Sequence, residues 1–346
     1  MNPIIEERIE DLEKKVGKEV VYPINFCIPK ELLLSTVPEK KKQFGTVIPG
    51  NMSTYIFDDQ QKYYEDYQDS YFGYTWKKGQ WDTIRTQEIM MNGCIPLFMD
   101  IDKCPKYSLM HHDKLRYQKI RDNYEKFGTD EYQEHAQWAL NYCYENLTTE
   151  AMAQFVLNTV GAQNAKNVLF ITLGDQADHL NDFMFHGFRS ILGKGLVETN
   201  KLWWMYKDIH EGYTYRGTGD DRKRIDETNP NISQKDKDGL IRKKVKVNEL
   251  RGKAFTYSNH LEDILVDREN IEDKINERYF DLIIYGSIHR CDDYFELVSS
   301  KYDKEKILIL DVDDDIVNKK QRPDAFLKYK NKGIYFCTDL TSIIEL

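Results

Sequence analysis

The sequence predicts an α/β protein with two Rossmann-like domains, and three observations lead to this fold class. Short apolar segments alternate with helical stretches along the chain, which is typical of βαβ units and an open parallel sheet. The pattern restarts after Gly161, so we expect a boundary near residues 160–166. Four segments of the second half are apolar throughout, like strands that are buried on both faces of a parallel sheet. They lie at residues 168–172, 280–286, 306–311 and 333–336.

The first domain, expected over residues 1–160, begins with a charged amphipathic helix that runs through Glu19. Its later elements alternate between strand and helix, and a long helical stretch with a break near Gly128 ends it. These later elements are strands at 70–74 and 94–98, a helix at 81–92 that Gly93 terminates, and helical pieces over 117–160.

The second domain is expected over residues 161–346 and carries a basic insertion at 216–247. The insertion has ten Lys or Arg residues against six Asp or Glu residues, and few apolar ones. A long solvated loop is the simpler interpretation of such a segment. The functional alternative is a basic flap over an anionic substrate.

Composition excludes several classes of protein. The 346 residues carry 58 acidic and 49 basic side chains, a net charge of −9, so a general nucleic-acid binder is not expected. No segment reaches the roughly 18 apolar residues of a membrane span, and the N-terminus lacks the order of a secretory signal. Six cysteines without a CxxC pair suit a reducing compartment, so we expect a cytoplasmic protein.

The expected helix at 81–92 places two charged side chains in the middle of its apolar face. At about 100° per residue, Arg85 and Glu88 share a narrow stripe with Trp81, and apolar side chains flank the stripe. Burying charges is costly unless they are paired or bind something polar. One interpretation is a structural Arg85–Glu88 ion pair. The other is a helix facing a cleft, where the carboxylate binds ribose hydroxyls and the arginine neutralises a diphosphate.

This stretch resembles the donor-binding domain of exostosin-like and related polysaccharide-building glycosyltransferases with the GT-B fold. Their pattern is roughly Ser-x-Phe, then Lys-Lys-x-Gly-Trp-Asp, Arg and Glu, and a closing Asn-Gly-Cys-hydrophobic-Pro. The resemblance is specific over residues 68–105 and looser as far as residue 160; Gln80 and Thr86 depart from it. The matching residues are Ser70, Phe72, Lys77, Lys78, Trp81, Asp82, Arg85, Glu88, Gly93, Cys94 and Pro96.

The second half resembles the acceptor-side domain of the same enzymes, through segments such as 178–189 and 280–290. In those relatives this half comes first and the donor half second. The reversed order here indicates a circular permutation, in which joining Leu346 to the start of the chain restores the usual order. Such rearrangement is tolerated when the chain ends lie close together at the surface.

The resemblance implies two Rossmann-like domains that face a central cleft, and a metal-independent glycosyltransferase of the hexosyl or pentosyl class. It would move a sugar from a nucleotide diphosphate, with UDP expected, to a carbohydrate or glycan acceptor. No cofactor is expected beyond this donor, and no metal. The expected donor-binding residues are Lys77, Lys78, Trp81, Asp82, Arg85, Glu88 and Gly93.

If the reaction inverts the anomeric centre, a base must take the proton of the acceptor hydroxyl. The base should come from the opposite domain, at the carboxyl ends of its strands. Asp178, Asp182 and His186, which follow the strand at 168–172, are the candidates for this catalytic role. The simpler alternative is a solvated helix face. His289, after the strand at 280–286, is a second-rank candidate.

Three other functions stay open. A nucleotide-sugar epimerase is one, because that chemistry also occurs on this fold. A non-catalytic module that binds nucleotides or carbohydrates is another, because some motif positions are altered. A glucosyltransferase acting on DNA bases, with the 216–247 insertion as its basic contact, is the weakest.

Overall fold

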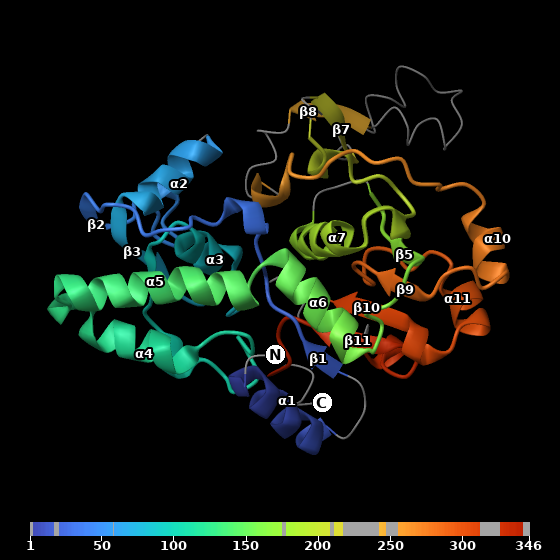
Figure 1. Cartoon of the computed structure of the whole chain (residues 1–346), viewed down its shortest axis with the longest axis horizontal. Helices are drawn as coiled ribbons and strands as arrows, with labels where there is room; N and C mark the ends of the chain where they lie inside the picture. Colours follow the sequence, from blue (N-terminus) through green and yellow to red (C-terminus); the bar gives the residue numbers. More distant parts are fainter. Residues whose placement is uncertain are drawn as a thin grey trace.

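The computed structural model describes residues 3–16, 21–57, 59–174, 178–207, 211–216, 242–246, 255–311 and 326–341. Two parallel sheets lie side by side, each with its own helices (Figure 1). The predicted α/β class is therefore confirmed. The described helices include none that is both long enough and apolar enough to cross a membrane.

The larger sheet has six strands in the order β1-β11-β10-β9-β5-β6, and every described pairing is parallel. The four apolar segments of the second half supply its middle strands, as predicted, while β1 and β6 complete it. The bounds are β1 Val21–Pro23, β5 Val168–Ile171, β6 Leu196–Glu198, β9 Leu282–Tyr285, β10 Ile307–Asp311 and β11 Ile334–Cys337.

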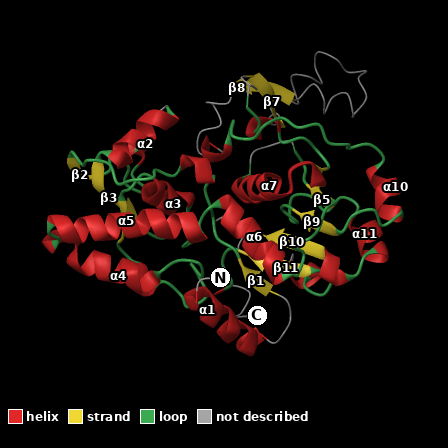
Figure 2. Cartoon of the chain, viewed as in Figure 1, coloured by secondary structure: helices red, strands yellow, loops and turns green. Residues whose placement is uncertain are grey.

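Both faces of this sheet are covered, which explains why its strands are apolar throughout. Phe170 and Ile284 point to one face, where they join a core with residues of α6 and α7. Leu169 and Ile283 point to the other face, where they join residues of α1, α10 and α11. Figure 2 shows these helices around the strands. The bounds are α1 Pro3–Val16, α6 Thr149–Thr159, α7 His179–Leu192, α10 Ile271–Asn276 and α11 Phe295–Lys301.

The first strand of the chain belongs to the larger sheet, not to the smaller one. Val21 of β1 pairs with Tyr335 of β11. Residues 1–160 therefore contribute an edge strand to the sheet that is otherwise built by the second half of the chain. This pairing also places the first strand directly beside the last.

The smaller sheet has three parallel strands in the order β2-β3-β4. The predicted strands at 70–74 and 94–98 are present. The helix between them begins at Ile84 and not at Trp81, because Thr83 is the N-cap residue. The long helical stretch breaks at Gly128, as predicted. The bounds are β2 Lys42–Phe44, β3 Ser70–Thr75, β4 Ile95–Phe98, α2 Gln60–Gln68, α3 Ile84–Met91, α4 Lys114–Asn123 and α5 Thr129–Asn146.

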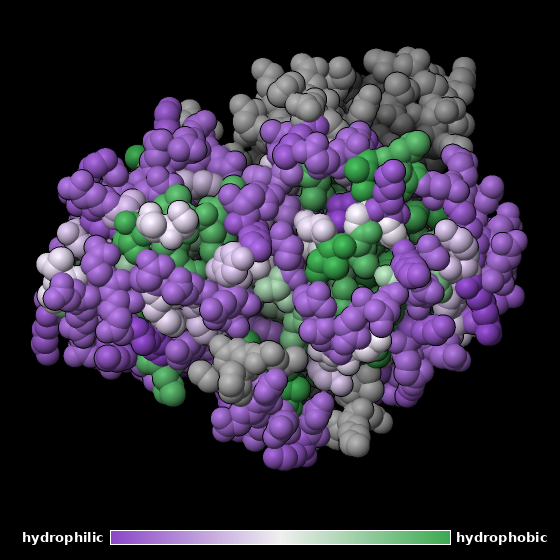
Figure 3. All heavy atoms as spheres, viewed as in Figure 1, coloured by the Kyte–Doolittle hydropathy of each residue, from purple (hydrophilic) through white to green (hydrophobic). Residues whose placement is uncertain are grey.

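Part of the basic insertion forms a strand. β8, Arg242–Lys246, pairs with β7, Glu211–Arg216, in an antiparallel ribbon. The expectation of a loop over the whole of 216–247 is therefore wrong for residues 242–246. Residues 217–241 lie outside the described residues. The face of the protein shown in Figure 3 is mostly hydrophilic.

The packing of α7 on α6 yields a stability prediction. A Cβ atom on Gly187 of α7 would overlap the backbone carbonyl of Thr149 at the start of α6. Gly187→Ala should therefore lower the free energy of unfolding by about 3 kcal/mol, because backbone atoms would have to move apart. Chemical denaturation measures this loss.

Gly128→Ala is the matched control, because a Cβ atom there meets nothing within 4 Å and the residue has a φ of −74°. It should change the free energy of unfolding by less than about 1 kcal/mol. Equal losses in both variants would contradict the close approach of the two helices.

Candidate functional site

The carboxyl ends of the two parallel sheets meet each other. Gln80 lies in the loop after β3, and its Oε1 accepts a hydrogen bond of 3.0 Å from the hydroxyl of Thr338, which directly follows β11. Asp82 Oδ2 accepts hydrogen bonds from Asn25 Nδ2 at 2.8 Å and from the Phe26 backbone at 2.6 Å. Asn25 and Phe26 follow β1. Ligands of open α/β sheets bind at carboxyl edges of this kind, so the region where the edges meet is the candidate site.

Asp82 joins the two sheets. Its carboxylate is buried, and its second oxygen accepts a hydrogen bond of 3.2 Å from Gln87 Nε2. His112 Nε2 lies 3.7 Å from the same oxygen. The sequence predicts that Asp82 binds the nucleotide-sugar donor. Both of its carboxylate oxygens, however, already accept hydrogen bonds from groups of the chain itself.

Three basic side chains gather at the carboxyl edge of the smaller sheet. Lys78 Nζ lies 5.9 Å from the ring centroid of Tyr55, and the Arg85 guanidinium lies 5.4 Å from it. Arg85 also donates a 2.8 Å hydrogen bond to the Tyr55 hydroxyl. Lys77 Nζ lies 5.7 Å from the ring centroid of Trp81.

These three cations form no ion pair with a carboxylate in the described part of the chain. Among the described residues, no carboxylate lies within 4.0 Å of the charged groups of Lys77, Lys78 or Arg85. Both lysines are exposed in the loop after β3, while Arg85 is half-buried. The sequence motif predicted these three residues, but it gave no sign of Tyr55, which lies thirty residues before Arg85. Unpaired cations at a carboxyl edge suit an anionic ligand.

Arg85 keeps its charge in this position. Burial works against the charged form, but the surrounding oxygens of Tyr63, Tyr67 and Tyr55, together with Glu88, raise the pKa of Arg85 above its usual value. Its Nε is buried without a hydrogen-bond partner in the described structure.

Glu88 lies at a contact between the two halves of the chain, with an exposed fraction of 6%. Its Oε2 accepts a 2.8 Å hydrogen bond from the Tyr63 hydroxyl, and its Oε1 accepts a 2.6 Å hydrogen bond from Thr256. Thr256 belongs to the second half. Within the described chain, Glu88 forms no ion pair with Arg85, so neither a direct pair nor an open carboxylate is present.

Trp81 and Gly93 support the fold. Trp81 is buried and stacks on Phe98 of β4, with ring centroids 6.1 Å apart. Gly93 ends α3 with a φ of +62°, and a Cβ there would lie 2.8 Å from Pro38. Only glycine adopts this conformation without strain. The predicted stop of the helix at Gly93 is confirmed.

Asp178 caps α7 and is fully engaged. Its Oδ1 accepts hydrogen bonds from the backbone of Leu180 at 3.0 Å and of Asn181 at 3.4 Å. Its Oδ2 forms an ion pair with Arg290 and lies 3.5 Å from the Ser287 hydroxyl. Both of its carboxylate oxygens are therefore already used by groups of the chain itself.

The other two expected catalytic side chains are buried. Asp182 has an exposed fraction of 0%, and its Oδ2 accepts hydrogen bonds from Trp204 Nε1 and the Asp178 backbone. Burial, together with the nearby Asp178, raises the pKa of Asp182 well above its usual value.

His186 has an exposed fraction of 1%. Its Nδ1 lies 2.8 Å from Thr149 Oγ1, and its Nε2 lies 3.3 Å from Glu31 Oε1. Burial works to raise the pKa of Glu31, but His186 and the nearby His260 lower it to about 2. The buried His186 thus pairs with the carboxylate of an exposed residue, Glu31.

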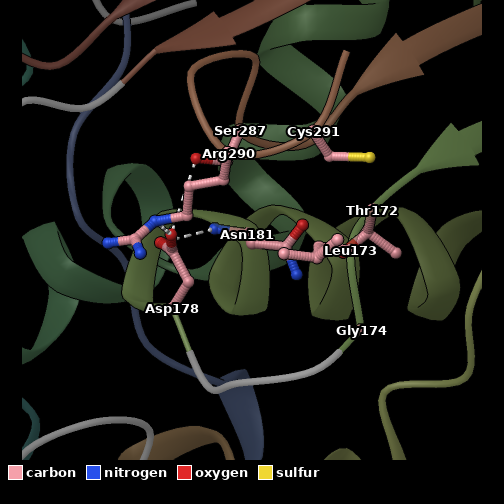
Figure 4. Close-up of a pocket in the computed structure, with 8 residues that line it drawn as sticks. All are labelled: Thr172, Leu173, Gly174, Asp178, Asn181, Ser287, Arg290 and Cys291. Carbon is pink, nitrogen blue, oxygen red and sulfur yellow. Dashed lines mark hydrogen bonds and ion pairs between the residues drawn. The ribbon is translucent and has the colours of Figure 1, made fainter. Parts of the chain in front are cut away.

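A recess opens at the carboxyl ends of the neighbouring strands β5 and β9 (Figure 4). Its volume is about 10 Å³, which is room for about one water molecule. Of the three expected catalytic residues, only Asp178 lines it. The lining residues are Thr172, Leu173, Gly174, Asp178, Asn181, Ser287, Arg290 and Cys291.

Several side chains that line the recess carry hydrogen-bond donors or acceptors. Figure 4 shows the side-chain amide of Asn181 within it, between Cys291 and Leu173. A Cβ atom on Gly286 would overlap the Asn181 amide oxygen, so the glycine makes room for this amide. A side-chain amide, a hydroxyl from Ser287 and the charged Asp178–Arg290 pair offer both donors and acceptors, which suits a recess the size of a water molecule.

No group of three or more His, Cys, Asp or Glu side chains that could hold a metal ion occurs in the described part of the chain. No protein-family model matches the sequence, and neither curated proteins nor solved structures yield a match.

The burial of Asp182 gives a prediction about pH. Because its pKa is raised in the folded protein, the unfolded chain releases this proton at lower pH than the folded protein does. The free energy of unfolding should therefore fall as pH rises from about 4 through the raised pKa. Asp182→Asn removes this ionisation and should make the protein more stable than the wild type at neutral pH, with no such gain near pH 4.

Denaturation at several pH values measures the difference. Asp303→Asn is the control, because Asp303 is exposed, and it should not change how the free energy of unfolding depends on pH. An Asp182→Asn variant that is less stable than the wild type at every pH would show that the carboxylate is needed as an anion.

Proposed function

We propose that this chain is a glycosyltransferase that uses a nucleotide-sugar donor, with the GT-B arrangement of two domains around a cleft. The observation that carries the proposal is the set of cations Lys77, Lys78 and Arg85, which form no ion pair with any described carboxylate, at the edge where the two sheets meet. In a chain with a net charge of −9, such a local excess of positive charge favours a site for an anionic ligand.

The chemistry of glycosyl transfer needs this charge. Negative charge grows on the departing diphosphate while positive charge develops on the sugar, as it does in glycoside hydrolysis. Ammonium and guanidinium groups placed near the leaving oxygens stabilise that charge. Arg85, held by the Tyr55 hydroxyl, would bind the diphosphate together with the two exposed lysines.

The acceptor would occupy the opposite edge. A recess lined by Asn181, Ser287 and Asp178 lies at this edge, and because it has room for only about one water molecule, the acceptor would bind over its mouth. We assign Glu88 and Asp82 to joining the halves around the site, because their oxygens already hold groups of the chain. The pairing of β1 with β11 supports the permuted order of the two domains.

A non-catalytic nucleotide- or carbohydrate-binding module is the second candidate. One observation favours it: Asp178 is fully engaged, while Asp182 and His186 are buried. Turnover separates the two proposals. A glycosyltransferase releases nucleoside diphosphate from its donor, whereas a module binds the donor and leaves it intact.

The proposal predicts which charges hold the donor. The double variant Lys77→Ala/Lys78→Ala should bind UDP and UDP-glucose at least about tenfold more weakly than the wild type, a loss of roughly 1.4 kcal/mol or more, because two cations facing the diphosphate are removed. Isothermal titration calorimetry with UDP, UDP-glucose, GDP and GDP-mannose measures the affinities.

The matched control is Lys304→Ala/Lys306→Ala. These lysines are exposed in the short 3₁₀ turn Lys304–Lys306 that precedes β10, at the amino edge of the larger sheet. This double variant has the same net charge as the first but should bind like the wild type. Equal affinity of both variants for every nucleotide would contradict the assigned diphosphate site, and no binding by the wild type would end the proposal.

A further inference from the structure

Glycosyl transfer with inversion requires a base that the three expected catalytic side chains do not supply. Asp178 is saturated by hydrogen bonds and an ion pair. Asp182 and His186 lie inside the protein, where an acceptor hydroxyl does not reach them. A basic atom that is accessible at the carboxyl edge of the larger sheet is therefore needed.

His289 has this position. It follows β9, and its Nδ1 lies 3.3 Å from Oδ1 of Asp311, the last residue of the neighbouring strand β10. Asp311 is buried, and the Tyr335 hydroxyl from β11 donates a hydrogen bond to its Oδ2. Three adjacent strands thus fix the carboxylate beside the imidazole.

The arrangement leaves one nitrogen of the imidazole available. A carboxylate beside Nδ1 favours the tautomer that carries its proton there, so Nε2 keeps its lone pair. The His289 side chain is 34% exposed, and within the described structure Nε2 has no hydrogen-bond partner. Asp178 forms its ion pair with the next residue, Arg290. The carboxylate beside His289 is therefore that of Asp311.

We propose that His289 is the general base of the transfer reaction and that Asp311 is its positioning residue. This inference rests on the proposed function. Nε2 of His289 takes the proton of the acceptor hydroxyl while the acceptor oxygen forms a bond to the anomeric carbon. The bond from that carbon to the phosphate oxygen breaks, and its electron pair leaves with the diphosphate. The product then has the inverted configuration.

The recess supports this role for His289. Ser287 and Arg290 line it, and they lie on either side of His289 in the loop after β9. The recess is too small for a sugar, so a sugar acceptor would lie over its mouth, beside the loop that carries the imidazole. The recess and the His289–Asp311 pair therefore lie at neighbouring strand ends of one sheet.

The experiment measures release of nucleoside diphosphate from UDP-glucose, UDP-N-acetylglucosamine and GDP-mannose, with water or a panel of simple sugars as acceptor. His289→Ala should keep wild-type donor affinity in calorimetry and lose about a hundredfold or more in kcat. Added imidazole should restore part of the lost rate in this variant and none in Lys77→Ala/Lys78→Ala.

Asp311→Asn tests the positioning residue. Loss of the carboxylate removes a charge that favours the imidazolium, so the acid limb of the pH–rate profile should move to lower pH while kcat falls. Asp293→Asn is the control, because Asp293 is an exposed aspartate in the same loop region, and its profile should match the wild type.

The outcomes separate the two proposals. A wild-type protein that binds none of the donors overturns the proposed function, and the assigned base with it. Donor binding with undiminished turnover in His289→Ala overturns the base alone. A loss of turnover in that variant that imidazole does not restore, with an unshifted acid limb in Asp311→Asn, shows a structural role and also overturns the base.

Discussion

The hydrogen bonds of Asp82 to Asn25 and Phe26 are the contact on which the candidate site depends. They attach the loop after β3 to the end of β1, and so bring the carboxyl edges of two separate sheets together. Because Asp82 is buried, these bonds form where water does not compete, which strengthens them. Without this attachment the loop after β3 would not be held against the carboxyl edge of the larger sheet.

The strands of the larger sheet were predictable from the sequence because both of their faces are buried, as alternate contacts of Leu169 and Phe170 show. The start of α3 was placed too early, since Trp81 is apolar but belongs to the core before the helix. β1 was not predicted as a strand of the larger sheet, because its partner β11 is distant in the sequence.

The site was predictable only in part, for a related reason. Lys77, Lys78 and Arg85 follow one another closely, so a local motif indicates them. Tyr55 and Thr256 reach α3 through tertiary contacts that no local pattern reveals. The sequence left two interpretations of Glu88 open, an ion pair with Arg85 and a carboxylate facing a cleft. The structure shows neither, because Glu88 is buried and accepts hydrogen bonds from hydroxyl groups of both halves of the chain.

The pairing of β1 with β11 affects how the protein is made. Val21 leaves the ribosome long before Tyr335, its neighbour in the sheet, is synthesised. β10 and β9 can pair with each other before β11 is synthesised, whereas the backbone of β1 stays without its strand partner until then. Long-range parallel pairing is slow to form and prone to aggregation while incomplete. β1 should therefore join the larger sheet late in co-translational folding, although it is synthesised long before its partner β11.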